Sequence, residues 1–301
     1  MCGILFTNNP NINRELFIEA LNMMDHRGPD ADGYKEHGSI KLGHKRLKVI
    51  DLEDRSNQPF NSSCGRYSII FNGEIYNFRE LISEFKLNCL TSSDTEVILK
   101  LYIKLGSRFL EYLEGMFAFI IYDKKQNEFF VARDRLGVKP LYFLKEKNYI
   151  TLSSEIAPLL RFSNNLEIDD IALRQYRKLR TFFNERTIYK SIKVFPAANY
   201  FFDNKFQSYW QLSESDQAPP CDEEISELIE NSISMRLNAD VSYGSFLSGG
   251  IDSTIITKLS KPKHTWTVGF ENKNEFNWSI IPAKEIGSKH HQILIQNDEF
   301  D

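Results

Sequence analysis

Short apolar runs separated by Gly, Asn and Asp dominate the first two thirds of the chain, with two helical patterns between them. Apolar residues recur at helical spacing over residues 13–24 and again after Ser93, where Gly106 provides a stop signal. Strands are expected at residues 40–42, 47–52, 67–71, 117–122 and 128–132. This mixture predicts an α+β domain.

The pattern changes near residue 213, where a polar stretch with two prolines can neither pair in a sheet nor continue a helix. After an amphipathic helix at residues 223–237, strands are expected at 243–247, 265–270 and 291–295, alternating with helices at 252–259 and from about 279. Pro282 would break the interior of the last helix, so that helix is expected to begin near Ile281. The alternation predicts a parallel sheet, and the expected domains are 2–205 and 223–301, joined by a linker at 206–222.

Composition narrows the class of protein. A length of 301 residues is enough for two domains, and 42% hydrophobic with 26% charged residues is ordinary for a soluble globular chain. A net charge of −4 gives no basic field for nucleic acid or an anionic membrane. No apolar run approaches the roughly 20 residues that span a bilayer, and no secretory leader is evident, so a cytoplasmic protein is expected. The four cysteines are widely spaced without a CxxC pair, which indicates neither a zinc site nor a disulfide framework.

Cys2 stands apart by its position. Removal of Met1 would leave a thiol and a free α-amine on the same carbon. An α-amine with a pKa of about 8 can take the proton of a thiol with a pKa of about 8.5, which is the chemistry of an N-terminal nucleophile. The alternative is an accidental cysteine, and Cys2 alone does not decide between the two.

Four short polar clusters offer a substrate pocket for such a nucleophile. Arg46 carries a planar fork suited to a carboxylate, although a surface arginine on a half-exposed strand is equally consistent. Asn72 and Gly73 could donate N–H groups to an oxyanion, but Asn-Gly is also the commonest hairpin turn. Glu74 could hold a substrate ammonium. Asp94 follows two serines and can serve as a helix N-cap, as a second carboxylate for the same ammonium, or as both.

Six motifs occur in the order found in the glutaminase domain of glutamine-hydrolysing asparagine synthetases, which the chain resembles over essentially its whole length. They are Cys2-Gly3-Ile4 and residues 26–30 (HRGPD), 46–51 (RLKVID), 72–77 (NGEIYN), 115–119 (GMFAF) and 133–142 (RDRLGVKPLY). The resemblance implies an N-terminal nucleophile αββα sandwich followed by the start of an α/β parallel-sheet domain of the ATP pyrophosphatase type. It also implies Cys2 as nucleophile, Asn72 and Gly73 as oxyanion hole, and Arg46, Leu47, Lys48, Val49, Ile50, Asn72, Gly73, Glu74 and Asp94 as glutamine-binding residues.

A second candidate site lies at residues 247–253 (LSGGIDS), between an expected strand and an expected helix. Two glycines let backbone N–H groups approach an anion at a helix N-terminus, although a capped strand-to-helix turn is the alternative. The segment resembles the pyrophosphate loop of ATP pyrophosphatases. The resemblance implies ATP binding by Leu247, Ser248, Gly249, Gly250, Ile251, Asp252, Ser253 and Val268, with Asp252 as a weak Mg²⁺ ligand.

Together these features predict a glutamine-dependent asparagine synthetase that uses ATP and Mg²⁺. Its expected partners are glutamine and either aspartate or another carboxylate acceptor, with no nucleic acid or membrane, and a homodimer is left open. The family's second domain continues beyond the length present here, so the chain is either part of a longer protein or a shortened paralogue. Three alternatives stay open: a glutaminase alone, an enzyme that amidates another carboxylate, and a non-enzymatic remnant that binds a nucleotide or a partner. Residues 248–253 argue against a phosphoribosyltransferase-linked amidotransferase.

Overall fold

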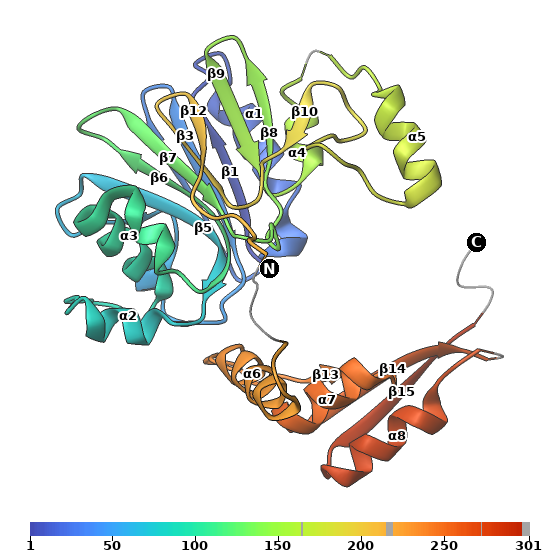
Figure 1. Cartoon of the computed structure of the whole chain (residues 1–301). Helices are drawn as coiled ribbons and strands as arrows, with labels where there is room; N and C mark the ends of the chain where they lie inside the picture. Colours follow the sequence, from blue (N-terminus) through green and yellow to red (C-terminus); the bar gives the residue numbers. More distant parts are fainter. Residues whose placement is uncertain (164, 215–218, 272, 297–301) are drawn as a thin grey trace. The chain divides into compact units, whose positions relative to one another are not determined.

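A computed structural model describes residues 1–163, 165–214, 219–271 and 273–296 (Figure 1). The chain divides into two units, Met1–Glu214 and Ser215–Asp301, which are described separately. The first unit continues past residue 205, because β12 (Lys205–Ser208) pairs with β11 (Asn199–Phe202). None of the helices in the described residues has the length and apolar character needed to cross a bilayer.

Two six-stranded sheets form the centre of the first unit. The first has the order β10 (Ile192–Val194), β8 (Tyr142–Glu146), β9 (Tyr149–Ser153), β1 (Gly3–Thr7), β3 (Ile40–Arg46) and β2 (Ala31–His37). The second has the order β12, β11, β7 (Glu128–Arg133), β6 (Gly115–Asp123), β5 (Tyr67–Ile75) and β4 (Phe60–Asn61). Neighbouring strands are antiparallel in both sheets.

Helices cover the outer face of each sheet. The first sheet carries α1 (Arg14–Asn22) and α4 (Ile156–Leu160), and the second carries α2 (Phe78–Glu84) and α3 (Asp94–Leu105) (Figure 1). The remaining helical segments are η1 (Asp25–Arg27), η2 (Asp54–Ser56), η3 (Gly106–Glu111) and α5 (Asp170–Leu179).

Three separate apolar clusters show how these layers pack. In β6, Phe117 and Phe119 face α3, whereas Ala118 and Ile120 face the other sheet. On the far side, Leu5 of β1 packs against α1. Because both faces of the central strands are buried, their sequences are continuously apolar rather than alternating. The layers are therefore helix, sheet, sheet and helix, which confirms the expected αββα sandwich.

Two strand predictions near the candidate residues are wrong. Residues 47–52 form a loop and not a strand, because the Arg46 guanidinium donates to the carbonyl oxygens of Ile50 and Asp51 and the backbone curls around it. The strand predicted to end at residue 71 continues to Ile75, so Asn72-Gly73 is not a hairpin turn. Register explains the difference, since Asn72 pairs with Ala118 in the middle of a long ladder with β6.

The second predicted helix is present as α3, but its cap differs from the expected one. Ser93 is the N-cap, and its hydroxyl accepts from the backbone N–H of Thr95. Asp94 is the first helical residue, and its carboxylate turns away to accept from the N–H of Ile75. Gly106 ends the helix with a φ of 60°, as expected of a glycine stop.

The second unit contains α6 (Asp222–Met235) and a three-stranded parallel sheet in the order β13 (Ser245–Phe246), β14 (His264–Phe270) and β15 (Lys289–Ile295). Helices α7 (Ile251–Ser260) and α8 (Phe276–Glu285) connect the strands, which confirms the predicted parallel order. The predicted start of the last helix near Ile281 is wrong, because α8 begins at Phe276 and contains Pro282. The proline removes the bond to the carbonyl of Trp278, and the burial of Pro282 and Ala283 offsets that loss.

The two-sided burial of β6 generates a stability prediction. Phe119→Ala, at 0% exposure, should lower the free energy of unfolding by about 3–5 kcal/mol because it removes an aromatic ring and leaves a cavity. Phe183→Ala, at 48% exposure, is the matched control and should change it by less than about 0.5 kcal/mol. Urea unfolding followed by circular dichroism measures both, and equal losses would contradict the layer assignment.

Candidate active site

A cavity of about 190 Å³ lies at the N-terminus of β1. Segments distant in sequence meet there: the chain start, the loop after β3, the end of β5, the start of α3, the start of β6 and the loop after β7. Its lining residues are Met1, Cys2, Arg46, Leu47, Val49, Ile50, Gln58, Phe71, Asn72, Gly73, Glu74, Ser93, Asp94, Thr95, Met116 and Lys139. Of the residues predicted for glutamine, only Lys48 does not line the cavity; its backbone N–H donates to Asp30 and its ammonium pairs with Asp54.

The Cys2 thiol is held at one wall of this cavity. The N–H of Leu47 donates to its sulfur at 3.4 Å, and the sulfur donates to the Leu47 carbonyl at 3.7 Å. Burial raises the pKa of the Cys2 thiol above its ordinary value, despite the lowering effect of Leu47, the terminal amine and Arg46. The thiol therefore needs a base to become a nucleophile.

The chain's own amino terminus lies in the same cavity. Burial lowers the pKa of the Met1 amine, and the positive charges of Arg27 and Lys139 lower it further. Arg27 is fixed by two bonds, one from its Nε to the Cys2 carbonyl at 2.9 Å and one to Glu155 at 3.0 Å. The surroundings thus favour a neutral amine, which is the form that accepts a proton.

Asn72 lies in the interior with its amide unused. Its side chain is 0% exposed, and neither its Nδ2 nor its Oδ1 has a hydrogen-bond partner among the described residues. Such a group costs about 1–3 kcal/mol, so it indicates a partner that arrives with the substrate. Next to it, a Cβ on Gly73 would lie 2.3 Å from the Met116 carbonyl, so only glycine fits. The two residues bring an amide and a backbone N–H to the cavity wall.

Two carboxylates also line this cavity. Asp94 is buried, and burial raises the pKa of its carboxyl to about 6, although the N–H of Ile75 donates to it at 3.1 Å. Glu74 lines the same cavity from β5. A substrate ammonium would supply the positive charge that two carboxylates in one small cavity favour.

The guanidinium of Arg46 donates its hydrogen bonds within its own loop. Its Nη1 donates to the Glu53 carbonyl at 3.0 Å and to Asn57 at 2.7 Å, and its Nη2 donates to the carbonyls of Ile50 and Asp51. The terminal N–H groups that sequence analysis offered to a substrate carboxylate are thus bonded to the loop in this structure. Because none of these partners carries a negative charge, the guanidinium still contributes a positive charge to the cavity wall.

Sequence reasoning missed Lys139 as a site residue. It is 5% exposed and lines the cavity, and no hydrogen bond or ion pair joins its ammonium to a described residue. Burial lowers the pKa of Lys139, although Glu74 opposes this shift. Lys139 belongs to the 133–142 motif, but a lysine in a polar loop reads as a surface residue until the fold is known.

The second candidate site follows the carboxyl end of β13. Gly249 has a φ of 85°, and a Cβ there would lie 2.7 Å from the Cβ of Trp278. The Ser248 and Ser253 hydroxyls are 3.0 Å apart, and Gly250 is the N-cap of the ten-residue helix α7. A loop at the carboxyl end of a parallel strand and the N-terminus of a helix favours an anionic ligand.

Of the remaining residues expected around ATP, Leu247 is buried, while Ile251 and Val268 are exposed. The described residues contain no group of three or more His, Cys, Asp or Glu side chains arranged for a metal ion. Asp252, in the first turn of α7, fits Mg²⁺ only as one carboxylate beside phosphate oxygens.

The sequence profile of the glutamine amidotransferase domain matches residues 1–210. The chain belongs to the glutamine amidotransferase family. The asparagine synthase profile matches residues 224–301 of this amidotransferase.

Relatives of this amidotransferase carry the name asparagine synthetase. It is 34% identical to a putative glutamine-hydrolyzing asparagine synthetase 2 of Methanocaldococcus jannaschii, over 100% of this chain and 66% of the relative. It is also 34% identical to the glutamine-hydrolyzing asparagine synthetase 1 of Bacillus subtilis, over 100% of this chain and 51% of the relative. The chain thus spans between half and two thirds of the length of these relatives. The glutamine phosphoribosylpyrophosphate amidotransferase of B. subtilis shares the fold, with a TM-score of 0.51 at 16% identity, over 97% of this chain and 65% of that one.

The unused amide of Asn72 generates a prediction with a built-in control. Asn72→Ala should change the free energy of unfolding by less than about 1 kcal/mol, because it removes two unsatisfied polar atoms together with some packing. Gln58→Ala removes an amide whose Oε1 accepts from the N–H of Phe71 at 2.6 Å, and should cost about 1–3 kcal/mol. Urea unfolding of both variants makes the comparison, and an equal loss would show that Asn72 has a structural partner.

Proposed function

We propose that this chain is a glutamine-dependent amidotransferase of the asparagine synthetase type. In this proposal the first unit hydrolyses glutamine and the second binds ATP for the activation of a carboxylate. One observation carries it: the half-buried Cys2, the chain's amino terminus and the unused Asn72 amide line a single cavity.

The nucleophile in this proposal requires removal of Met1, which leaves the α-amine on Cys2. That amine takes the thiol proton, and the sulfur attacks the side-chain carbonyl carbon of glutamine. The negative oxygen that forms receives N–H groups from Asn72 and Gly73. The amine returns its proton to the departing nitrogen, which leaves as ammonia, and water then hydrolyses the glutamyl thioester to glutamate and free thiol.

Glutamine is oriented by charges that line the cavity. Asp94 and Glu74 bind its α-ammonium, a role that is supported by the burial of the Asp94 carboxyl, which forms no ion pair with a described residue. Arg46 and the loop of residues 47–50 line the end proposed for the α-carboxylate. Burial, with the positive charges of Arg27 and Lys139, lowers the pKa of the Met1 amine here, and in this proposal the same surroundings act on the amine of Cys2 once Met1 is removed.

The second reaction is supported by the loop of residues 247–253 and by the names of the relatives. Backbone N–H groups at Gly249 and Gly250, with the Ser248 and Ser253 hydroxyls, would bind the pyrophosphate part of ATP, with Leu247, Ile251 and Val268 beside the nucleoside. Mg²⁺, held by Asp252 and phosphate oxygens, would neutralise phosphate charge. Aspartate is the proposed acceptor, which gives asparagine after ammonia displaces AMP.

A glutaminase without synthetase activity is the second candidate. The family match over residues 1–210 contains every residue proposed for glutamine, so this half-reaction does not require the second unit. Asparagine formation separates the two candidates.

Cys2→Ala tests the nucleophile. We expect intact mass to show that the wild-type chain lacks Met1, and glutamate release to fall at least about a thousandfold in the variant because no other group can form the thioester. Cys89→Ala, a half-buried cysteine outside the cavity, should keep the wild-type rate. Glutamine hydrolysis by Cys2→Ala at the wild-type rate would refute the proposal, and asparagine production with ATP and aspartate would decide for the synthetase.

The pKa of Asp94 predicts how glutamine binding depends on pH. As pH falls through about 6, the raised carboxyl takes up a proton and loses its attraction for the α-ammonium, which stays charged. The Kd of glutamine for the catalytically inactive Cys2→Ala chain should therefore rise about tenfold between pH 7 and pH 5. Calorimetry measures this Kd. Asp94→Asn in the same background should bind weakly at both pH values, and an unchanged pH dependence in that variant would contradict the assignment.

A further inference from the structure

Asp51 lies between two walls of the glutamine cavity, and the proposed chemistry does not use it. It follows Ile50 directly, its side chain is 1% exposed, and its backbone φ is +49°. A buried carboxylate and a left-handed conformation at a residue other than glycine each cost free energy. Such a residue is retained only where several bonds hold it in place.

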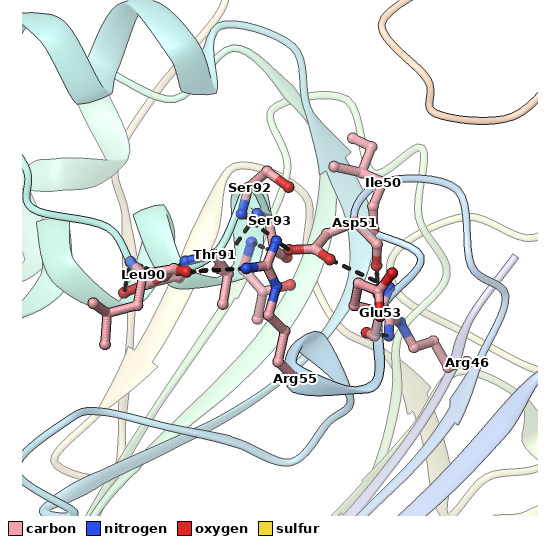
Figure 2. Close-up of polar contacts among 11 residues, drawn as sticks. Arg46, Ile50, Asp51, Glu53, Arg55, Leu90, Thr91, Ser92 and Ser93 are labelled. Carbon is pink, nitrogen blue, oxygen red and sulfur yellow. Dashed lines mark hydrogen bonds and ion pairs between the residues drawn. The ribbon is translucent and has the colours of Figure 1, made fainter.

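One of these bonds joins two loops that are far apart in sequence, and the others hold Asp51 within its own loop. The N–H of Ser92 donates to Asp51 Oδ2 at 2.9 Å, and the N–H of Glu53 donates to Oδ1 at 3.3 Å. Arg55 pairs with Oδ2 at 3.2 Å, and Arg46 donates to the backbone carbonyl of Asp51. Figure 2 shows Asp51 between Arg46 on one side and the Ser92 segment on the other. Burial opposes ionisation of Asp51, but the hydrogen bonds outweigh it and lower the pKa of the carboxyl.

Each side of this link leads directly to a group in the cavity. Ser92 is two residues before Asp94, which lines the cavity. On the other side, Ile50 lines the cavity and Arg46 bonds to Asp51 itself. Asp51 therefore joins the loop that carries Arg46 to the segment that carries Asp94.

We propose that Asp51 is a positioning residue that fixes the spacing between the groups that bind the α-carboxylate and the α-ammonium of glutamine. This role rests on the proposed function of the cavity. Asp51 is thus a determinant of selectivity for amides that carry both an α-carboxylate and an α-ammonium. If the groups that bind these two charges are wrongly spaced, only one of the two charges is bound well. Asp51 itself does not contact the substrate.

The link can be removed without unfolding the helix that it reaches. Glu96 of α3 accepts from the backbone N–H groups of Leu90 and Thr91, at 3.0 and 2.7 Å, so the loop before the helix keeps its own anchor. The cap formed by Ser93 is also independent of Asp51. Arg55 Nη1 also donates to the Leu90 carbonyl at 3.4 Å, so loss of the Asp51 carboxylate weakens the connection between the two loops at Ser92 while α3 stays in place.

Asp51→Asn tests the link. Asparagine tolerates positive φ as aspartate does, so the backbone keeps its conformation, but its NH₂ group replaces an acceptor that faces the N–H of Ser92 or Glu53. Hydrogen exchange of the full-length variant should be about tenfold or more faster in the peptide that contains Ser92. The KM for glutamine should rise about tenfold, while kcat stays within about threefold because Cys2 and Asn72 are untouched.

Asp54→Asn is the matched control. Asp54 lies in the same loop, but it is 82% exposed and bonds only to Lys48 and Asn57 within that loop. Its replacement should change neither the exchange near Ser92 nor the KM by more than about twofold.

The outcomes separate this inference from the proposed function. No glutaminase activity in the wild-type chain would refute the proposed function, and unchanged exchange near Ser92 in Asp51→Asn would refute the link itself. Faster exchange with an unchanged KM, or a loss confined to kcat, would overturn the positioning role. If Asp51→Asn does not fold, Asp51→Glu, which keeps the charge but displaces the bond to Ser92, carries the same expectation.

Discussion

The face-to-face packing of two antiparallel sheets is the constraint on which the first unit depends. It requires β1, β5 and β6 to be largely apolar on both faces, so that a buried polar residue such as Asn72 within β5 is an exception. Cys2 stands just before β1, and Asn72 to Glu74 occupy the last part of β5. The cavity is thus a consequence of the layer arrangement, since strand ends from the two sheets meet there.

Several polar groups in the cavity are buried in states that lower the stability of the fold. Among the described residues, the buried amide of Asn72 has no hydrogen-bond partner and the ammonium of Lys139 has no ion pair, while burial raises the pKa of the Asp94 carboxyl. Each costs stability in the free protein. A ligand with a carbonyl oxygen, an ammonium and a carboxylate would satisfy such a set, which is the basis on which glutamine is proposed as the substrate.

Arg46 and Asp51 show how a loop without regular structure becomes a precise wall. The guanidinium gathers backbone carbonyls around itself, and the carboxylate ties the same loop to the segment before α3. Both side chains form hydrogen bonds with backbone groups. These bonds hold the loop in place, as strand pairing holds the backbone elsewhere in the unit. Because these side-chain contacts, and not strand pairing, hold the loop in place, residues 47–52 are not a strand although they are rich in β-formers.

By itself, the sequence determined the four-layer class, the parallel order of the second unit, the family and most of the lining of the cavity, because apolar periodicity and ordered motifs are local properties. Only the tertiary structure decided that Asn72 lies inside a strand with its amide unused, that the fork of Arg46 is bonded to its own loop, and that Ser93 and not Asp94 caps α3. It alone brought Lys139 beside Cys2 and Asp51 beside Ser92. Those outcomes depend on which distant backbone groups compete for a side chain, and no local pattern encodes that competition.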